Sequence, residues 1–214
     1  MSQPRLRLFP ADEPLPRSSR MPTGRALRWS SPLEDGAKAA VTVFVTQGAF
    51  VRVCAHAGSD LTNEVGGVLA GRWRVDRSTG ESFVVVEGVL PAAHTRQGRT
   101  YVTFTQDSLV DLNSELERRY PGKLMVGWYH THPRMDVFLS GYDVWLHEHF
   151  FPELWHVALV IEPHKTSGGF FIRMPDGHLD PHRYFGFFEL TDSGRSVVHW
   201  RNLTPEGGRE EAAE

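Results

Sequence analysis

The apolar residues of this chain gather in one block, residues 41–200, and their spacing alternates between two periods. Alternating or continuous apolar stretches bounded by turn residues predict strands over 41–47, 65–75, 81–90, 123–132, 155–163, 168–174, 184–190 and 196–200. Apolar residues three and four apart predict helices over 49–58, 107–120 and 140–150. Because the helices are interspersed among more numerous strands, we expect an α/β (α+β mixed) fold with a central mixed sheet flanked by helices.

The two ends of the chain show neither period. Residues 1–40 hold six of the 14 prolines and seven basic residues against four acidic ones, which predicts a disordered N-terminal tail rich in Pro and Arg. Residues 204–214 are acidic and carry few apolar side chains, which predicts a disordered C-terminal tail. The expected domain is therefore 41–203.

Composition narrows the partners and the chemistry. The 23 basic and 26 acidic residues nearly balance, so we expect no nucleic-acid partner and no membrane partner. No window reaches the ~20 apolar residues of a membrane span, and the N-terminus does not resemble a secretory signal, so we expect a cytoplasmic protein. A single cysteine, Cys54, excludes an intrachain disulfide and cysteine-rich zinc sites, whereas 11 histidines leave His and carboxylate ligands open.

The segment GWYHTHPRMDVFLSGYDVW carries the candidate chemistry. Side chains alternate faces along a strand, so His130 and His132 project to one side while Thr131 points away. Pro133 lacks a backbone N–H and ends the strand where the two imidazoles emerge. This pair is half of a zinc site.

A second pair, Ser140 and Asp143, follows His132 after seven intervening residues. Taken alone, Ser-x-x-Asp is a variant of the helix capping box, with Ser140 as the N-cap and Asp143 near the positive helix end. That reading does not exclude function, because a carboxylate held at a helix start can serve as a third metal ligand. Two His and one Asp would leave a fourth tetrahedral position for water, as in catalytic zinc sites.

A hydrolytic zinc site also needs a base. The candidate is Glu64, at the head of the strand EVGGVLAG. By itself, a Glu at a strand start is usually a solvated end residue, so its assignment depends on the rest of the pattern.

Together these residues, in this order and spacing, resemble the JAMM motif of the JAB/MPN metalloprotease family. EVGGVLAG, VGWYHTHP, FLSGYD and VALVIEP stand in the family's order, and the resemblance covers about residues 41–190. It implies the MPN/JAB (cytidine-deaminase-like) fold and one catalytic Zn²⁺. It further implies the following roles: His130, His132 and Asp143 as zinc ligands, Glu64 as general base and then acid, and Ser140 as the donor to the oxyanion.

The resemblance also implies the substrate. The family hydrolyses peptide or isopeptide bonds after the C-terminal Gly-Gly tail of ubiquitin or a ubiquitin-like protein, so a ubiquitin-like protein or its conjugate is the expected partner, with activating and conjugating enzymes in the same pathway. We expect the tail to pair with a sheet edge at residues 101–105 or in the loop Ala92 to Arg99. Only a short stretch, 164–169, follows VALVIEP, and no cysteines are available for a second zinc, which favours a minimal prokaryotic-type deubiquitinase-like enzyme.

Two alternatives stay open. The substrate could be a sulfur-carrier conjugate or precursor, or the chain could bind a ubiquitin-like fold without cutting it. The complete ligand set favours catalysis over the second alternative.

The remaining residues considered for a functional role have weaker support from the sequence. His147 and His149 lie two apart on a helix and cannot bind one ion together, although His147 shares the face of Asp143 and could orient that carboxylate. Cys54 lies on an apolar helix face and is expected to be a small buried residue. Trp128 and Tyr129 are expected in the core.

Overall fold

A computed structural model describes residues 15–34, 36–92 and 106–206. Its helices are α1 (Gln47–Ala57), α2 (Gln106–Arg119) and α3 (Gly141–Phe150), with a short 3₁₀ helix η1 (Thr23–Arg25). Its strands are β1 (Arg17–Ser19), β2 (Ala26–Ser30), β3 (Thr42–Thr46), β4 (Gly66–Asp76), β5 (Ser82–Pro91), β6 (Leu124–Thr131), β7 (Val157–Glu162), β8 (Ser167–Ile172), β9 (Phe187–Leu190) and β10 (Thr204–Glu206).

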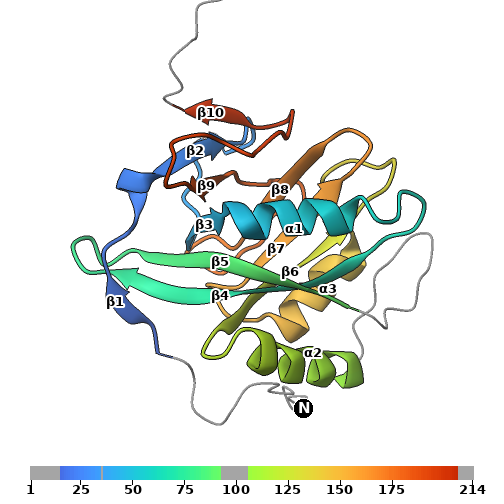
Figure 1. Cartoon of the computed structure of the whole chain (residues 1–214), viewed down its shortest axis with the longest axis horizontal. Helices are drawn as coiled ribbons and strands as arrows, with labels where there is room; N and C mark the ends of the chain where they lie inside the picture. Colours follow the sequence, from blue (N-terminus) through green and yellow to red (C-terminus); the bar gives the residue numbers. More distant parts are fainter. Residues whose placement is uncertain (1–14, 35, 93–105, 207–214) are drawn as a thin grey trace, which may run out of the picture.

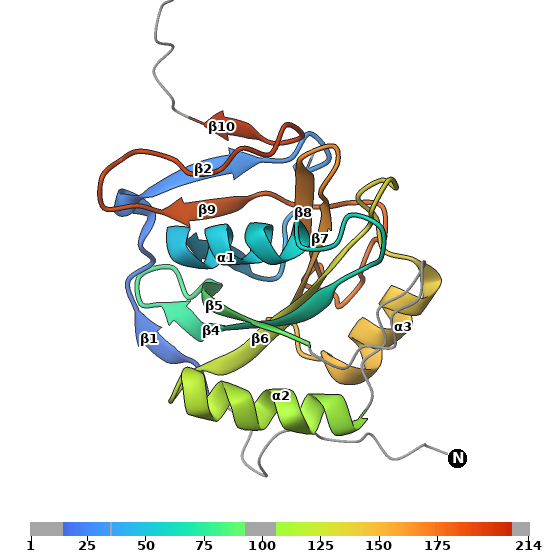
Figure 2. The same cartoon turned by 45° about the vertical axis from the view of Figure 1, so that its right-hand side comes forward.

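Within the described residues, ten strands form one mixed sheet in the order β10-β2-β9-β3-β5-β4-β6-β7-β8, with β1 pairing β4 in parallel. Helix α1 lies on one side of β4 and β5 and α2 on the other (Figures 1 and 2). The expected mixed α/β fold with flanking helices is confirmed. No helix of these described segments is long and apolar enough to cross a membrane.

Strands β6 and β7 lie near the edge strand β8, run parallel to each other and are buried along nearly their whole length. Parallel strands need cover on both faces, which explains why VALVIE reads as a continuous apolar run. The N-cap of helix α1 is Thr46, whose side chain accepts a hydrogen bond from the Ala49 N–H, and the helix buries Ala49, Phe50 and Val53 on one face. The end of β6 therefore lies in the buried core.

The N-terminal expectation is wrong for the residues between 17 and 30. Strand β2 pairs with β9 and β10, and β1 pairs with β4. Trp29 anchors β2, because its ring is buried and its Nε1–H donates to the Glu189 carboxylate at 3.1 Å. Residues 1–14 of the expected tail lie outside the described residues.

Two C-terminal expectations also change. Residues 204–206 form β10 rather than part of a tail, and the remainder of that segment lies outside the described residues. Residues 196–200 form no strand. The Glu189 carboxylate accepts hydrogen bonds from the Val197 N–H (2.7 Å) and the Ser196 hydroxyl, so this backbone is satisfied by a side chain instead of a ladder.

Candidate metal centre

The site begins where β6 ends, with two histidines on one face of the strand. His130 and His132 are 0 % and 3 % exposed. Their Nε2 atoms lie 2.9 Å apart. Two buried imidazole nitrogens this close are arranged to share an ion rather than solvent.

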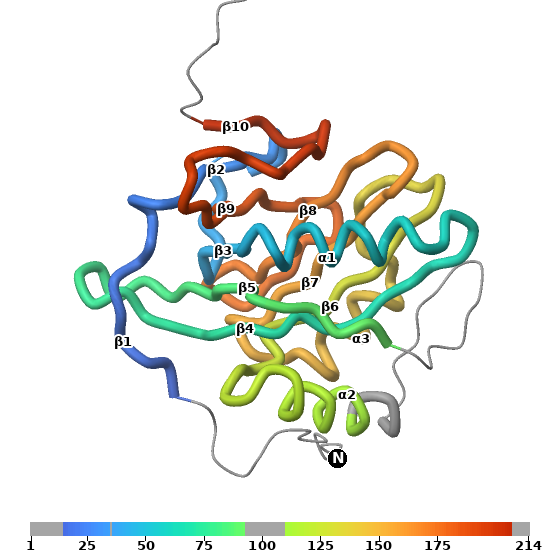
Figure 3. The backbone as a smooth tube through the Cα atoms, in the orientation of Figure 1, coloured from blue at the N-terminus to red at the C-terminus, as the bar shows by residue number. Residues whose placement is uncertain are grey.

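The third group comes from the start of α3, which the chain reaches by a loop after β6 (Figure 3). Ser140 is the N-cap: its hydroxyl accepts from the Asp143 N–H at 3.2 Å, and the Asp143 Oδ2 accepts from the Ser140 N–H at 2.7 Å. This reciprocal capping box fixes the Asp143 carboxylate. Its Oδ1 lies 3.5 Å from His130 Nε2, and its Oδ2 lies 3.8 Å from His132 Nε2.

These distances fit one zinc ion. Ligands ~2.0–2.1 Å from a tetrahedral zinc lie about 3.3 Å from one another. The three separations here, 2.9, 3.5 and 3.8 Å, bracket that value. His130, His132 and Asp143 thus form a metal-ligand group in the described part of the chain. Three protein ligands of this kind leave one position for water or substrate.

Protonation also favours metal binding. Burial, followed by the neighbouring His130, lowers the pKa of His132 to about 4, so its imidazole is neutral at neutral pH. Burial raises the pKa of the Asp143 carboxyl, but His130 and the hydrogen bonds from His130 and Ser140 outweigh it, and the pKa lies well below its ordinary value. At neutral pH the ligand set therefore includes a neutral His132 imidazole and an ionised Asp143 carboxylate.

Each imidazole is oriented by a neighbour. The Nδ1 of His132 lies 3.1 Å from the Asp136 carbonyl oxygen, which can only accept, so Nδ1 carries the proton and Nε2 offers its lone pair. The His130 ring stacks on Trp128, with centroids 4.7 Å apart and planes 10° from parallel. Trp128 in turn donates its Nε1–H to His147 Nδ1 at 3.1 Å.

Strand pairing relates Glu64 to the two histidines. Gly66 of β4 stands opposite His130 of β6, and the antiparallel register continued by two residues brings Glu64 opposite His132. The Thr131 N–H donates to the Val65 carbonyl, and the Val65 N–H donates to the Thr131 hydroxyl, each at 2.9 Å. Residues opposite each other in an antiparallel pair share a face, so the buried Glu64 side chain belongs to the face of the two histidines.

Comparison with known proteins gives the context of this geometry. The family described as JAB1/Mov34/MPN/PAD-1 ubiquitin protease matches residues 38–152, more than half of the chain. The chain belongs to the JAB/MPN family. The resemblance predicted from the motif is therefore confirmed, and this family includes metalloproteases.

Individual proteins are similar to this chain over part of their length. COP9 signalosome complex subunit 5 of Caenorhabditis elegans is 31% identical over 148 residues, 62% of this chain and 37% of that protein. The NAD(+) hydrolase TcpA of Theionarchaea archaeon (strain DG-70-1) is 36% identical over 85 residues, 38% of this chain and 25% of that protein. The chain thus spans less than two fifths of the length of these relatives.

A solved structure supports the fold alone. Protein DSY2949 from Desulfitobacterium hafniense, determined in solution, superposes with a TM-score of 0.50 at 23% identity, covering 66% of this chain and 90% of that one.

Some expectations for this JAB/MPN chain change in detail. His147 is fully buried, as its place on the face of Asp143 allows, but its ring nitrogens contact Trp128 (3.1 Å) and the Arg173 guanidinium (2.8 Å) rather than the carboxylate. His149 is exposed, and its Nδ1 bonds to the Trp145 carbonyl. Within the described residues, the contact of His147 that leads toward the metal site is the one with Trp128.

Three residues support the site although the sequence motif did not identify them. Trp128 is in the core as expected, yet it also supports His130; Thr131 fastens the Glu64 segment; and Asp136 sets the tautomer of His132. The signal for Thr131 was its place between two ligands, pointing to the other face. The segments expected to pair with the substrate tail lie outside the described residues, apart from Ala92.

Proposed function

We propose that this chain is a zinc-dependent metallopeptidase or isopeptidase that hydrolyses the bond after the C-terminal Gly-Gly tail of a ubiquitin-like protein. The observation that carries the proposal is the buried group of His130, His132 and Asp143, which matches zinc in donor type and spacing and has Glu64 on the same face. The substrate class is suggested by the description of the family, which names a ubiquitin protease.

The residues divide the work as follows. A bound zinc ion supplies Lewis acidity, which polarises the scissile carbonyl and lowers the pKa of water. Glu64 takes the proton of the attacking water on its carboxylate and passes it to the leaving amine nitrogen. Ser140 keeps its hydroxyl proton free, because its oxygen is the acceptor in the capping bond from Asp143, so it can donate to the oxyanion.

The test separates the base from the ligands. Glu64→Gln should retain zinc and lose ~10²–10⁴ in kcat, because it removes only proton transfer. His130→Ala should lose the metal. Zinc content is measured by elemental analysis, and cleavage of ubiquitin-like proteins extended past Gly-Gly is measured by mass spectrometry.

The matched control is Glu117→Gln, the same chemical change at an exposed position of α2, which should keep both zinc and rate. Native turnover in Glu64→Gln, or wild-type protein without near-stoichiometric zinc, would contradict the mechanism. Product masses that show a cut away from Gly-Gly would contradict the substrate.

A further inference from the structure

A buried carboxylate outside the catalytic set stands at the end of β7. Glu162 is 0 % exposed, and no Lys or Arg side chain among the described residues forms an ion pair with it. Its oxygens accept instead from three backbone N–H groups: Arg134 at 2.8 Å, His164 at 3.1 Å, and Lys165. Charge-assisted bonds of this kind make the burial of an unpaired carboxylate tolerable.

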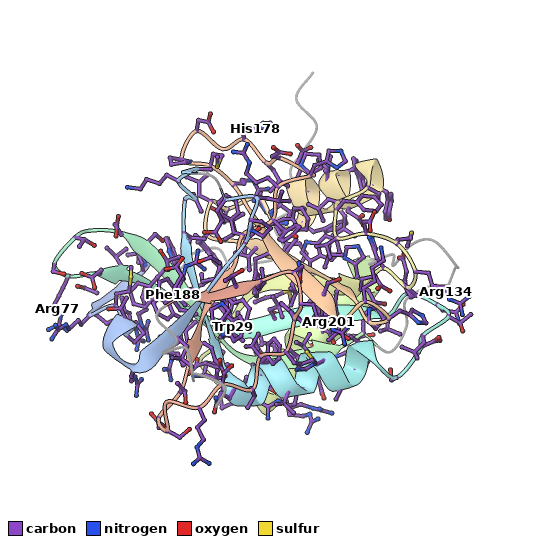
Figure 4. The ribbon with its side chains drawn as sticks, turned by 90° about the horizontal axis from the view of Figure 1, so that it is seen from above. Trp29, Arg77, Arg134, His178, Phe188 and Arg201 are labelled. Atoms are coloured by element: carbon purple, nitrogen blue, oxygen red, sulfur yellow. The ribbon has the colours of Figure 1, made fainter. Side chains whose placement is uncertain are left out.

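Two of those bonds close the turn between β7 and β8, residues 162–166, but the third does not. Arg134 is 28 residues earlier in the chain, in the loop directly after the zinc ligand His132. Its side chain lies at the edge of the molecule (Figure 4), so only its backbone reaches Glu162. A carboxylate needed only for the turn would have no use for this bond.

The loop thus held is the one that orients His132. Arg134 has a φ of 65°, a left-handed conformation that is unfavourable for a side-chain-bearing residue and needs surrounding contacts to persist. Two residues later, Asp136 gives its carbonyl to His132 Nδ1, while its carboxylate pairs with Lys165 Nζ at 2.5 Å. The turn therefore grips this loop twice, at Arg134 and at Asp136.

The same turn also contacts the other side of the site. His164 Nε2 lies 2.8 Å from the carbonyl oxygen of Leu61, which can only accept, so Nε2–H donates. Leu61 is three residues before Glu64, in a loop otherwise shaped by Asp60, whose carboxylate accepts from the Thr62 and Asn63 N–H groups. Through His164, the turn touches the segment that carries the proposed base.

We propose that residues 162–166 form a brace that holds His132 and Glu64 in fixed relation, with Glu162 and His164 as positioning residues. The Glu162 arm fixes the loop that orients His132. The His164 arm fixes the segment leading to Glu64. The first arm needs only a metal site, whereas the catalytic effect of the second rests on the proposed function.

The Glu162 arm is tested with metal. Glu162→Gln replaces one accepting oxygen by an NH₂ group, which cannot accept from a backbone N–H. We expect the Kd for zinc to rise about tenfold, as for other groups that orient a ligand, and the visible bands of the cobalt(II)-substituted protein to shift. Glu117→Gln, exposed on α2, is the matched control.

A second variant covers the case in which Glu162→Gln does not fold. Lys165→Met removes the exposed pair with Asp136, leaves the buried bonds intact, and should weaken zinc binding in the same direction by a smaller factor. Native affinity and native cobalt bands in both variants, or in Lys165→Met when the first is unfolded, would overturn the Glu162 arm.

The His164 arm is tested separately. His164→Ala should leave the cobalt bands and zinc affinity unchanged, speed amide hydrogen exchange in residues 58–65, and lower kcat about tenfold at constant KM, because only the base is displaced. His178→Ala is the matched control, since His178 is exposed and labelled elsewhere in Figure 4. Unchanged exchange in His164→Ala would overturn this arm; absence of turnover in the wild type would instead overturn the proposed function, with exchange and cobalt bands still judging the brace.

Discussion

Ser140 combines two duties in one hydroxyl group. As N-cap it accepts from the Asp143 N–H, and as proposed catalyst it donates to the oxyanion. A single alanine substitution would confuse the two, because it removes both the cap and the donor.

A pair of substitutions separates them. Ser140→Ala should cost about 0.5–2 kcal/mol of unfolding free energy, whereas Ser140→Gly should cost a few tenths, because glycine is a tolerated N-cap. Both should lose ~10²–10³ in kcat if the hydroxyl stabilises the oxyanion. Denaturant unfolding and kcat at low temperature measure the two effects. Activity that followed stability, with Ser140→Gly near native, would show that the hydroxyl matters only as a cap.

Among single residues, sequence could predict those fixed by short spacing. His130 and His132 share a face because a strand alternates, and Ser140 caps the helix that carries Asp143. Asp136 and Glu162 could not be predicted in this way. Asp136 contacts His132 through its backbone carbonyl, and Glu162 accepts from the backbone N–H of Arg134, so a backbone group that leaves no mark in the sequence takes part in each contact.

At the scale of elements, close approach of β6 and β7 depends on one glycine. A Cβ at Gly127 would lie 2.0 Å from the Val157 carbonyl oxygen, a backbone atom that cannot move aside alone. The same strand ends at Thr131, between the proposed metal ligands His130 and His132.

Gly127→Ala should therefore lower the unfolding free energy by about 1–3 kcal/mol or more, through displacement of β6 from β7. Denaturant unfolding with zinc removed measures this effect on the fold itself. Gly24→Ala is the control, because nothing lies within 4 Å of the added Cβ. Equal stability of the two variants would mean that the strands adjust without cost.

The elements missed in the sequence share one cause. Strand β2 pairs with β9, and the paired residues Trp29 of β2 and Phe187 of β9 are far apart in the chain. Strand β2 alternates only over residues 27–30 and the edge strand β10 shows no alternation, so both are too short to be predicted without the strands that pair with them. Residues 196–200 were predicted as a strand but form none. Their alternation is real, since Val198 and Trp200 are buried, but the Val197 N–H donates to the Glu189 carboxylate and not to a neighbouring strand.

For the whole molecule, buried histidines predict how stability depends on pH. Burial, followed by Arg173, lowers the pKa of His156 to about 3 and that of His147 well below its ordinary value. In the unfolded chain both would titrate near 6.5. Between these values the unfolded state binds more protons, so stability is complete above about pH 6.5 and falls as the pH falls below it.

The expected slope is about 1.4 kcal/mol per pH unit for each such histidine. His156→Gln should reduce the slope between about pH 6 and pH 4.5 by roughly one proton, whatever it does to stability at pH 7. Denaturant unfolding of zinc-free protein across this range measures the slope. An unchanged slope would show that His156 is protonated in the folded state.

The capping box at the start of α3 also implies that the chain folds before it binds a metal ion. Asp143 is fixed by Ser140, and His132 by Asp136, through contacts that need no ion. The side chains are therefore preorganised, and an arriving metal meets ligands whose conformational entropy was already lost in folding. A zinc finger folds only when its metal is bound. In this chain the fold positions the metal-binding side chains by itself, so the protein should stay folded when a chelator removes the metal.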